Sequence, residues 1–425
     1  MTLKSERIEI GNGIGLNLIK TDKFKSSLLS YYFIRPLSND EVTKNALLPL
    51  VLKRGSREYD TNLKIQRELE ENYGAKFSIG VNKKGDKQIL RFSVETVNRE
   101  YVEDKDYIYS VLKLLKSIIF SPLVEDGYFK EDYVNQEKEN LKTRIEGRIN
   151  NKRSYAIDRC IEEMCKGEKF SIYPIGNIED IEDIDGNVLY KQYQEIINTS
   201  PIEVFYTGEY DDKLIESIKE SISLKRDKII DIPDETIDID VDSKNMIEED
   251  LDVVQGKLVL GYRAGIHYKD KLYNGLLLAA DILGGGPNSK LFKNVREKGS
   301  LAYYINAMIY KYKSIILVDG GIEFKDFKKT LDIIKEQVED IKNGEFTDKD
   351  IDTSKRSIKS SMESIKDSTF LISEFFFSQG LSGDDRTLED IIDDMEKVTR
   401  QEIIEASSNI VLDTIYFMKN SKIED

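Results

Sequence analysis

The residues best able to do chemistry in this chain lie between positions 282 and 307, in the stretch ILGGGPNSKLFKNVREKGSLAYYINA. The pattern places Arg296 at the end of a predicted short helix and Tyr303 at the start of a predicted strand. The connection between them, Lys298 to Ser300, is short enough for both side chains to reach one site. A guanidinium carries a charge and a fork of N–H donors, and a phenol adds an O–H donor. Together they can hold a negatively charged oxygen.

Each of these two residues also has an ordinary structural explanation. An Arg at the end of a helix is commonly part of a surface ion pair. A Tyr in a strand commonly packs in a half-buried position. Their combination around one short connection favours a shared site over two independent structural roles.

Three consecutive glycines, Gly284, Gly285 and Gly286, precede this pair. Without side chains, the backbone there can approach a ligand or another chain closely. Pro287 cannot continue the preceding helix, so the run predicts a helix end followed by a turn. We expect these glycines, with the neighbouring strand, to bind an extended peptide by edge pairing.

The elements that position these residues recur twice along the chain. Each half begins with a strand, an apolar helix and a further helix, continues with two strands and long helices, and finishes on a short strand. In the first half, Tyr31, Tyr32 and Phe33 are contiguous, which predicts a strand buried on both faces. The expected elements of the first half are 27–34, 44–53, 61–73, 76–81, 88–95 and 202–207, and those of the second are 258–264, 272–283, 288–297, 301–308, 315–321 and 414–418.

This repetition predicts an α+β fold made of two copies of one unit. With strands clustered and helices segregated, each unit should be an antiparallel-rich sheet with helices packed on one face. The stretch from Asp227 to Asp252 is dominated by Asp and Glu and carries little core signal, so we expect an exposed, extended linker. The expected domains are 1–225 and 251–425, joined by an acidic linker at 226–250.

Composition excludes several kinds of protein. The net charge of −16 argues against binding nucleic acid, which needs a basic surface. No apolar run is long enough to span a membrane, and the N-terminus lacks the apolar middle of a signal peptide. We therefore expect a cytoplasmic protein with neither a nucleic-acid nor a membrane partner.

Metal and nucleophile chemistry is poorly supported within the chain. Cys160 and Cys165 are the two cysteines, and their spacing puts them on different faces of the predicted helix. His267 is the single histidine, expected in a polar loop, so no zinc site needing two histidines can form. The chain has no Gly-x-Ser-x-Gly nucleophile motif, and the glycine run lacks the spacing of a phosphate-binding loop.

The glycine run followed by SKLF and VREKGSLAY resembles the C-terminal half of the M16 peptidases, the pitrilysin, insulinase and mitochondrial processing peptidase family. The resemblance extends over the whole chain. It is greatest to the bacterial insulinase-like pair associated with elongation factor P 5-aminopentanol modification. In the family, a spaced Arg and Tyr form the R/Y motif, which Arg296 and Tyr303 match. The resemblance implies two homologous halves joined by a linker.

Active members of that family resemble one another in a His-x-x-Glu-His motif on the first apolar helix. The two His bind zinc and the Glu activates water. Aligning 54–56 with the family's Lys-Gly-Thr places Ala46, Pro49 and Leu50 at the three motif positions. These side chains can neither bind zinc nor move a proton. The family's third ligand is a Glu on a later helix, around Glu137 to Glu146 here, and without the histidines that helix is expected to be a solvated face.

The resemblance therefore implies a zinc-less partner subunit of a heterodimeric peptidase. Arg296 and Tyr303 would stabilise an oxyanion in trans on a peptide held by a zinc-bearing homologue, with Gly284 to Gly286 contacting that peptide. This chain would itself hold no cofactor. Two alternatives remain open: a structural, non-catalytic assembly subunit, as in the core proteins of respiratory complexes, and a solitary peptide-binding module.

Overall fold

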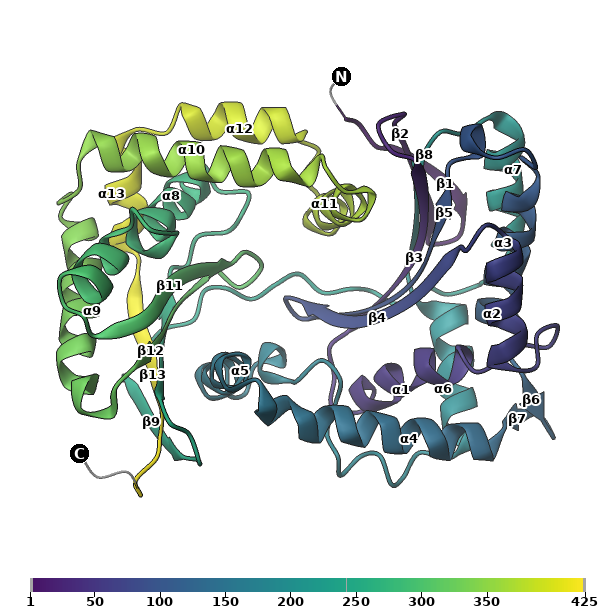
Figure 1. Cartoon of the computed structure of the whole chain (residues 1–425), viewed down its shortest axis with the longest axis horizontal. Coiled ribbons are helices and arrows are strands. Elements are labelled where there is room, and N and C mark those ends of the chain that lie inside the picture. Colours follow the sequence, from purple (N-terminus) through teal and green to yellow (C-terminus); the bar gives the residue numbers. More distant parts are fainter. Residues whose placement is uncertain (1–2, 242, 423–425) are drawn as a thin grey trace. The chain divides into compact units, whose positions relative to one another are not determined.

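The computed structural model describes residues 3–241 and 243–422. The chain folds into two compact units, and each is built from separate stretches of sequence (Figure 1). Unit 1 comprises Met1–Glu146, Ile172–Pro233 and Ile365–Thr387, and unit 2 comprises Gly147–Ser171, Asp234–Ser364 and Leu388–Asp425. These units differ from the contiguous halves expected from the sequence, because each half of the chain contributes a segment to both.

The sheet of unit 1 contains six strands within the described part of the chain, in the order β1-β2-β8-β3-β5-β4. Only the β2–β8 pair is parallel, and the other four pairings are antiparallel. Its central strand β3 is buried along almost its whole length, which confirms the prediction for the Tyr31–Phe33 segment. The strands are β1 Glu6–Gly11, β2 Ile14–Lys20, β3 Ser26–Pro36, β4 Lys76–Lys84, β5 Lys87–Val97 and β8 Ile202–Gly208.

The sheet of unit 2 repeats this pattern. Its five described strands follow the order β11-β12-β10-β13-β9, which corresponds strand for strand to β4-β5-β3-β8-β2. The β13–β9 pair is parallel and the remaining pairs are antiparallel, as in unit 1. The α+β class and the antiparallel-rich sheets predicted from the sequence are thus confirmed. The strands are β9 Asn245–Asp250, β10 Gly256–Arg263, β11 Ala302–Tyr310, β12 Ile315–Ile322 and β13 Val411–Lys419.

Most helices of unit 1 enclose one large core with the sheet. Helix α3 shows why: its apolar residues recur at helical spacing, so one face packs inward. These helices are α1 Val42–Leu52, α2 Asn62–Glu71, α3 Tyr107–Phe120, α4 Glu131–Glu146, α6 Gly186–Thr199 and α7 Asp212–Ser221. The smaller elements are a two-stranded ribbon, β6 Val124–Glu125 with β7 Tyr128–Phe129, and the 3₁₀ turn η1 Arg99–Tyr101.

A corresponding core lies on one face of the unit 2 sheet. Helix α13 begins with a capping box, in which the Thr399 side chain and Glu402 satisfy each other's backbone N–H groups. The helices are α8 Tyr273–Gly284, α9 Phe327–Lys342, α10 Asp348–Ile365, α12 Leu388–Glu396 and α13 Arg400–Ser408. The 3₁₀ turns of this unit are η2 Gly147–Asn150, η3 Lys169–Ser171 and η5 Phe324–Asp326.

Among the described residues, one helix covers the opposite face of each sheet, and it comes from the other half of the sequence. Helix α11, Thr369–Ser382, packs on unit 1, where the Phe377 ring stacks on Tyr32 with centroids 4.0 Å apart. Helix α5, Lys152–Met164, packs on β10 and β13 of unit 2 through residues such as Cys160. The expectation of helices on one face alone was therefore incomplete, because local periodicity does not show which sheet a helix covers.

The acidic stretch 226–250 is not an exposed linker along its whole length, because both of its ends contact the folded units. Arg226 is buried, and its guanidinium donates to the backbone oxygens of Asn12 and Ser200. At the other end, residues 245–250 form β9 rather than linker. The carboxylate of Glu249 accepts hydrogen bonds from Tyr155 and Tyr416, so this acidic residue is used in packing.

Candidate functional site

The glycine run spans the end of α8 in unit 2, where Gly284 is the last helical residue and Gly285 the C-cap. A Cβ on Gly284 would lie 2.4 Å from the backbone nitrogen of Ala307, so glycine is required for α8 to approach β11. A Cβ on Gly285 would lie 2.0 Å from Oδ1 of Asp281. Gly286 differs, because its φ is +150° and a Cβ there would meet nothing within 4 Å. Packing within the chain thus explains two of the three glycines, and only Gly286 has open space beside it.

Arg296 lies in a π-helical turn, Phe292–Glu297. The backbone N–H of Lys298 donates to the Lys293 oxygen over 3.0 Å, which is the wider hydrogen bond of a π-helix. Buried Val295 anchors the turn, whereas Arg296 is exposed and its guanidinium stacks over the Phe292 ring at 4.6 Å from the centroid. Turns of this kind are frequent at functional sites.

Tyr303 lies in a β-bulge at the start of β11. Ala302 pairs with Ile322 and Tyr304 pairs with Gly321, which leaves Tyr303 as the extra residue. A bulge redirects a side chain, and the Tyr303 side chain is 61% exposed. Since β11 is an edge strand among the described residues, its free edge is suited to pairing with an extended peptide.

The Tyr303 hydroxyl donates to the carboxylate of Glu323, the residue that follows β12. This hydrogen bond raises the pKa of Tyr303, and the nearby negative charge acts in the same direction. Sequence reasoning missed Glu323, because only the β11–β12 pairing brings it to Tyr303. An anionic ligand would have to compete with this carboxylate for the phenol.

Arg296 and Tyr303 are therefore both exposed in unit 2, but they have different partners. The guanidinium lies against an aromatic ring, and the phenol is bound to a carboxylate. Ser300, in the connection between them, has a φ of +52°, a left-handed conformation that is uncommon outside glycine. The local backbone thus has the bulge and the unusual turn that often accompany a functional loop.

Helix α1 of unit 1 carries the three positions where the family motif would lie. Ala46 and Pro49 are buried and Leu50 is partly buried. Ala46 belongs to the main core and Leu50 packs against it. The residues present therefore do not fit a zinc ion. Within the described part of the chain, no group of three or more His, Cys, Asp or Glu side chains is arranged to hold a metal ion.

Next to Ala46, the buried side chain of Asn45 on α1 is satisfied by amides. Asn45 donates to Gln88 over 2.8 Å and accepts from Gln192 over 2.8 Å. Gln88 also donates to the backbone oxygen of Pro174 over 2.8 Å. This network contains no titratable group, so it offers neither a general acid nor a general base.

Glu137 on α4 is the acidic residue from the expected ligand region that is buried, with 6% of its surface exposed. Nη1 of Arg54 lies 3.4 Å from its Oε1, and Asn140 donates to its Oε2 over 3.0 Å. This carboxylate therefore already has a cation and a donor from the protein. The expectation of a wholly solvated helix face does not hold at this position.

The single histidine lies in the connection between β10 and α8, and the two cysteines lie in α5 and at its C-cap. His267 is half-buried, its Nδ1 accepts from the backbone N–H of Lys269, and burial lowers its pKa. Cys160 and Cys165 are buried and form no disulfide, and burial raises the pKa of the Cys160 thiol. A buried thiol with a raised pKa is a poor nucleophile.

Residues 183–358 match the family described as "Peptidase M16 inactive domain". The chain is 36% identical over 412 residues to "Probable inactive metalloprotease YmfF" of Bacillus subtilis (strain 168), covering 96% of each chain. It is also 27% identical over 152 residues to "Uncharacterized zinc protease YmxG" of the same organism, covering 35% of this chain and 37% of that one.

Solved structures agree in fold. A conserved protein from Enterococcus faecalis V583 superposes with a TM-score of 0.90 at 28% identity, covering 99% of this chain and 100% of that chain. A peptidase M16 inactive domain from Pseudomonas fluorescens superposes with a TM-score of 0.82 at 16% identity, covering 100% and 99%. No helix in the described residues is long and apolar enough to cross a membrane.

Proposed function

This chain belongs to the M16 peptidase family, and we propose that it is a zinc-less subunit that acts together with a zinc-bearing homologue. One observation carries the proposal: apolar side chains fill the motif positions on α1, whereas Arg296 and Tyr303 remain exposed. A relative that matches almost the whole chain is named "Probable inactive metalloprotease", which supports the absence of peptidase activity in the isolated chain.

The role of the exposed pair is to bind the oxygen that becomes negative when a peptide bond is attacked. Arg296 supplies the charge and Tyr303 a short O–H donor, both in trans to a zinc-bearing partner. The Tyr303 O–H donates to Glu323 in the free chain and must turn away from that carboxylate to donate to this oxygen, because a phenol has a single proton to donate. The free edge of β11 and the open space at Gly286 receive the extended peptide.

The proposal is tested by reconstituting this chain with its zinc-bearing homologue, identified by co-purification. Arg296→Lys loses the guanidinium fork and Tyr303→Phe loses only the hydroxyl. Each should lower turnover by about a hundred- to a thousandfold, as loss of an oxyanion donor does. Tyr128→Phe, at a tyrosine that is 46% exposed in unit 1, is the control and should not change turnover.

Complex formation is measured alongside turnover. If both variants assemble and turn over at the wild-type rate, the catalytic role is wrong. The second candidate, a structural assembly subunit, then replaces it. The internal hydrogen bond between Tyr303 and Glu323 favours this alternative, since it already satisfies the phenol.

We place this activity in the cytoplasm, with neither a membrane nor a nucleic-acid partner. The sequence resemblance to the bacterial pair associated with elongation factor P 5-aminopentanol modification names one process in which the heterodimer would act. Loss of that modification in a strain that lacks this chain would support the link, and unchanged modification would contradict it.

A further inference from the structure

An open pocket of about 680 Å³ lies in unit 2. It is formed by the turn before α5, the first residues of α5 and the connection from β9 to β10. The side chain of Val254 there is 88% exposed. The lining residues are Asn150, Asn151, Lys152, Arg153, Asp252, Val253, Val254, Gln255 and Lys257.

Two cations of this pocket share one aromatic ring. The guanidinium of Arg153 lies 4.6 Å from the centroid of Tyr304, and Nζ of Lys257 lies 5.5 Å from it. Arg153 is held in place by buried Asp319, with distances of 2.5 Å from Nε to Oδ2 and 3.0 Å from Nη2 to Oδ1. The pocket therefore has a positively charged wall in a fixed position.

The cations of this pocket outnumber its carboxylates. The lining contains three cations, Lys152, Arg153 and Lys257, and one carboxylate, Asp252. Asp319 pairs with Arg153, so one positive charge is in excess. Burial lowers the pKa of Lys257, and the charge of Arg153 acts in the same direction. An incoming anion would relieve this repulsion.

A glycine in the neighbouring strand, Gly321, makes room for the side chains of Tyr304 and Gln255. A Cβ on Gly321 would lie 2.6 Å from Cε1 of Tyr304 and 2.7 Å from Oε1 of Gln255. Gln255 in turn accepts a hydrogen bond from Lys257. The missing side chain at this position thus lets the ring and the amide lie close to the strand.

We propose that this pocket binds a carboxylate of the peptide ligand, an inference that rests on the proposed function. The excess of one positive charge matches a monoanion, whereas a phosphate dianion would leave the site negative in a chain whose net charge is −16. The amides of Asn150, Asn151 and Gln255 provide further hydrogen-bond donors, and exposed Val254 provides apolar contact for the neighbouring side chain. The carboxylate is either the C-terminus of the peptide or an Asp or Glu side chain.

Fluorescence anisotropy on the full chain tests the proposal with three labelled peptides, of which the first two share one sequence and the third differs from the second by one Glu. The first ends in a free carboxylate, the second in an amide, and the third ends in an amide but contains a Glu. We expect the neutral amide to bind about tenfold more weakly than at least one of the acidic peptides, as for loss of one charge-assisted hydrogen bond. Binding of the first peptide alone assigns the site to the C-terminus.

The Lys257→Met variant should abolish this preference while its apolar stem still covers Tyr304. Lys329→Gln, on the exposed surface of α9, removes one charge elsewhere and should retain the preference. Lys152→Gln is the second test variant. Arg153 is left intact because its loss would leave buried Asp319 unpaired.

A second measurement separates this inference from the proposed function. N-acetylvaline and N-acetylvalinamide are titrated into the chain while the Lys257 resonance is followed by NMR after ¹³C-methylation. The acid alone should shift that resonance. If the acidic peptides and the neutral amide bind equally well, the carboxylate site is wrong and peptide binding still stands. Binding of N-acetylvaline at Lys257 without peptide binding supports the site and contradicts the proposed function, whereas no binding of either probe overturns both.

Discussion

Arg54 and Glu137 link two helices of unit 1, beside the helix that lacks the zinc residues. Glu137 is buried on α4, and Arg54 follows the end of α1. The same guanidinium donates to Gln136 and lies 5.1 Å from the ring centroid of Tyr133. The protein therefore supplies both the cation and the donors that a buried carboxylate requires.

Arg54→Ala should destabilise the protein, because Glu137 would stay buried without its cation. The expected loss is roughly 1–3 kcal/mol, the range for an unsatisfied buried group, and the midpoint of thermal unfolding measures it. Adding Glu137→Gln to Arg54→Ala should recover part of the loss, since a neutral amide needs no counter-charge. A double variant as unstable as Arg54→Ala would show that packing by the Arg54 stem dominates.

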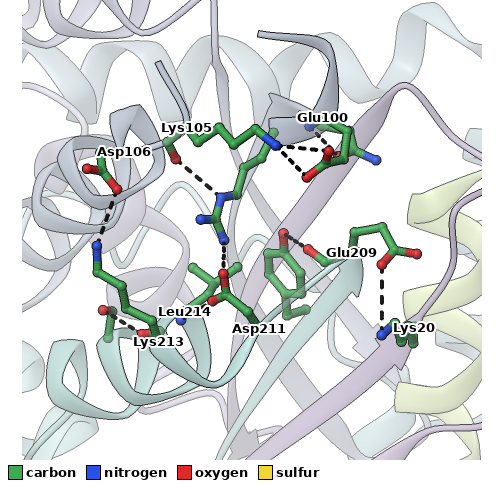
Figure 2. Close-up of polar contacts among 12 residues, drawn as sticks. Lys20, Glu100, Lys105, Asp106, Glu209, Asp211, Lys213 and Leu214 are labelled. Carbon is green, nitrogen blue, oxygen red and sulfur yellow. Dashed lines mark hydrogen bonds and ion pairs between the residues drawn. The ribbon is translucent and has the colours of Figure 1, made fainter. Parts of the chain in front are cut away.

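At the scale of elements, the start of α7 shows how a loop and a helix are joined. Asp211 caps the helix by accepting from the backbone N–H of Leu214 over 2.8 Å, and Arg99 donates to its other oxygen over 3.0 Å. Figure 2 shows the surrounding ion pairs, Lys213 with Asp106 and Lys105 with Glu100. These pairs lie at the surface and contribute little individually.

The cap makes stability depend on pH. The hydrogen bond from the Leu214 N–H lowers the pKa of Asp211 in the folded state. The contribution is therefore present above the unfolded value of 3.8 and is lost as pH falls through the lower folded pKa. Asp211→Ala should cost about 0.5–2 kcal/mol at neutral pH and less in acid. Asp211→Asn retains a cap and should cost less at neutral pH; a cost for Asp211→Ala that is equal at all pH values would contradict this account.

Helix α5 depends on a missing side chain in β10. A Cβ on Gly261 would lie 2.5 Å from the sulfur of Met164, so Gly261→Ala should displace the end of α5 and cost about 1–3 kcal/mol. Adding Met164→Ala to Gly261→Ala should restore part of the loss, because the smaller side chain makes room for the new methyl group. The matched control is Gly320→Ala on β12, where the nearest atom would be 3.4 Å away, an ordinary contact. Urea unfolding compares the four proteins, and equal losses for the two glycines would refute the packing argument.

At the scale of the whole molecule, the two units share the chain by exchanging one helix each. The first half of the sequence provides α5 to the unit 2 sheet, and the second half provides α11 to the unit 1 sheet. Fragments 1–233 and 234–425 should therefore each expose an apolar sheet face, including Tyr32 and Phe205 in the first. We expect each fragment alone to bind a hydrophobic dye and their co-expression to abolish that binding. Fragments that fold separately without dye binding would show that the exchanged helices are dispensable.

The isolated chain should bind no stoichiometric zinc and hydrolyse no peptide. The reason is the combination of one histidine with Ala46, Pro49 and Leu50 at the motif positions. Elemental analysis of protein treated with chelator and then exposed to zinc measures this directly. One tightly held zinc per chain would reveal a metal site that involves other residues.

The sequence by itself determined the α+β class, the repeated order of elements and the burial of β3 on both faces. It also determined the absence of a two-histidine zinc site, which follows from composition. Apolar periodicity is read from neighbouring residues, and composition is a count over the whole chain, so both can be obtained without knowing the tertiary structure. The helix and strand around Arg296 and Tyr303 were predictable for the same reason.

Tertiary structure alone decided which groups meet. Strand register decides three features of the site: the bulge at Tyr303, the hydrogen bond from Tyr303 to Glu323, and the position of β11 at an edge of the sheet. Contacts between residues far apart in sequence decide the exchange of α5 and α11 between the units. Such contacts also decide the pairing of β9 with β13. Periodicity shows that a face is apolar, but not which distant surface covers it, because that choice is made by the packing of the whole core.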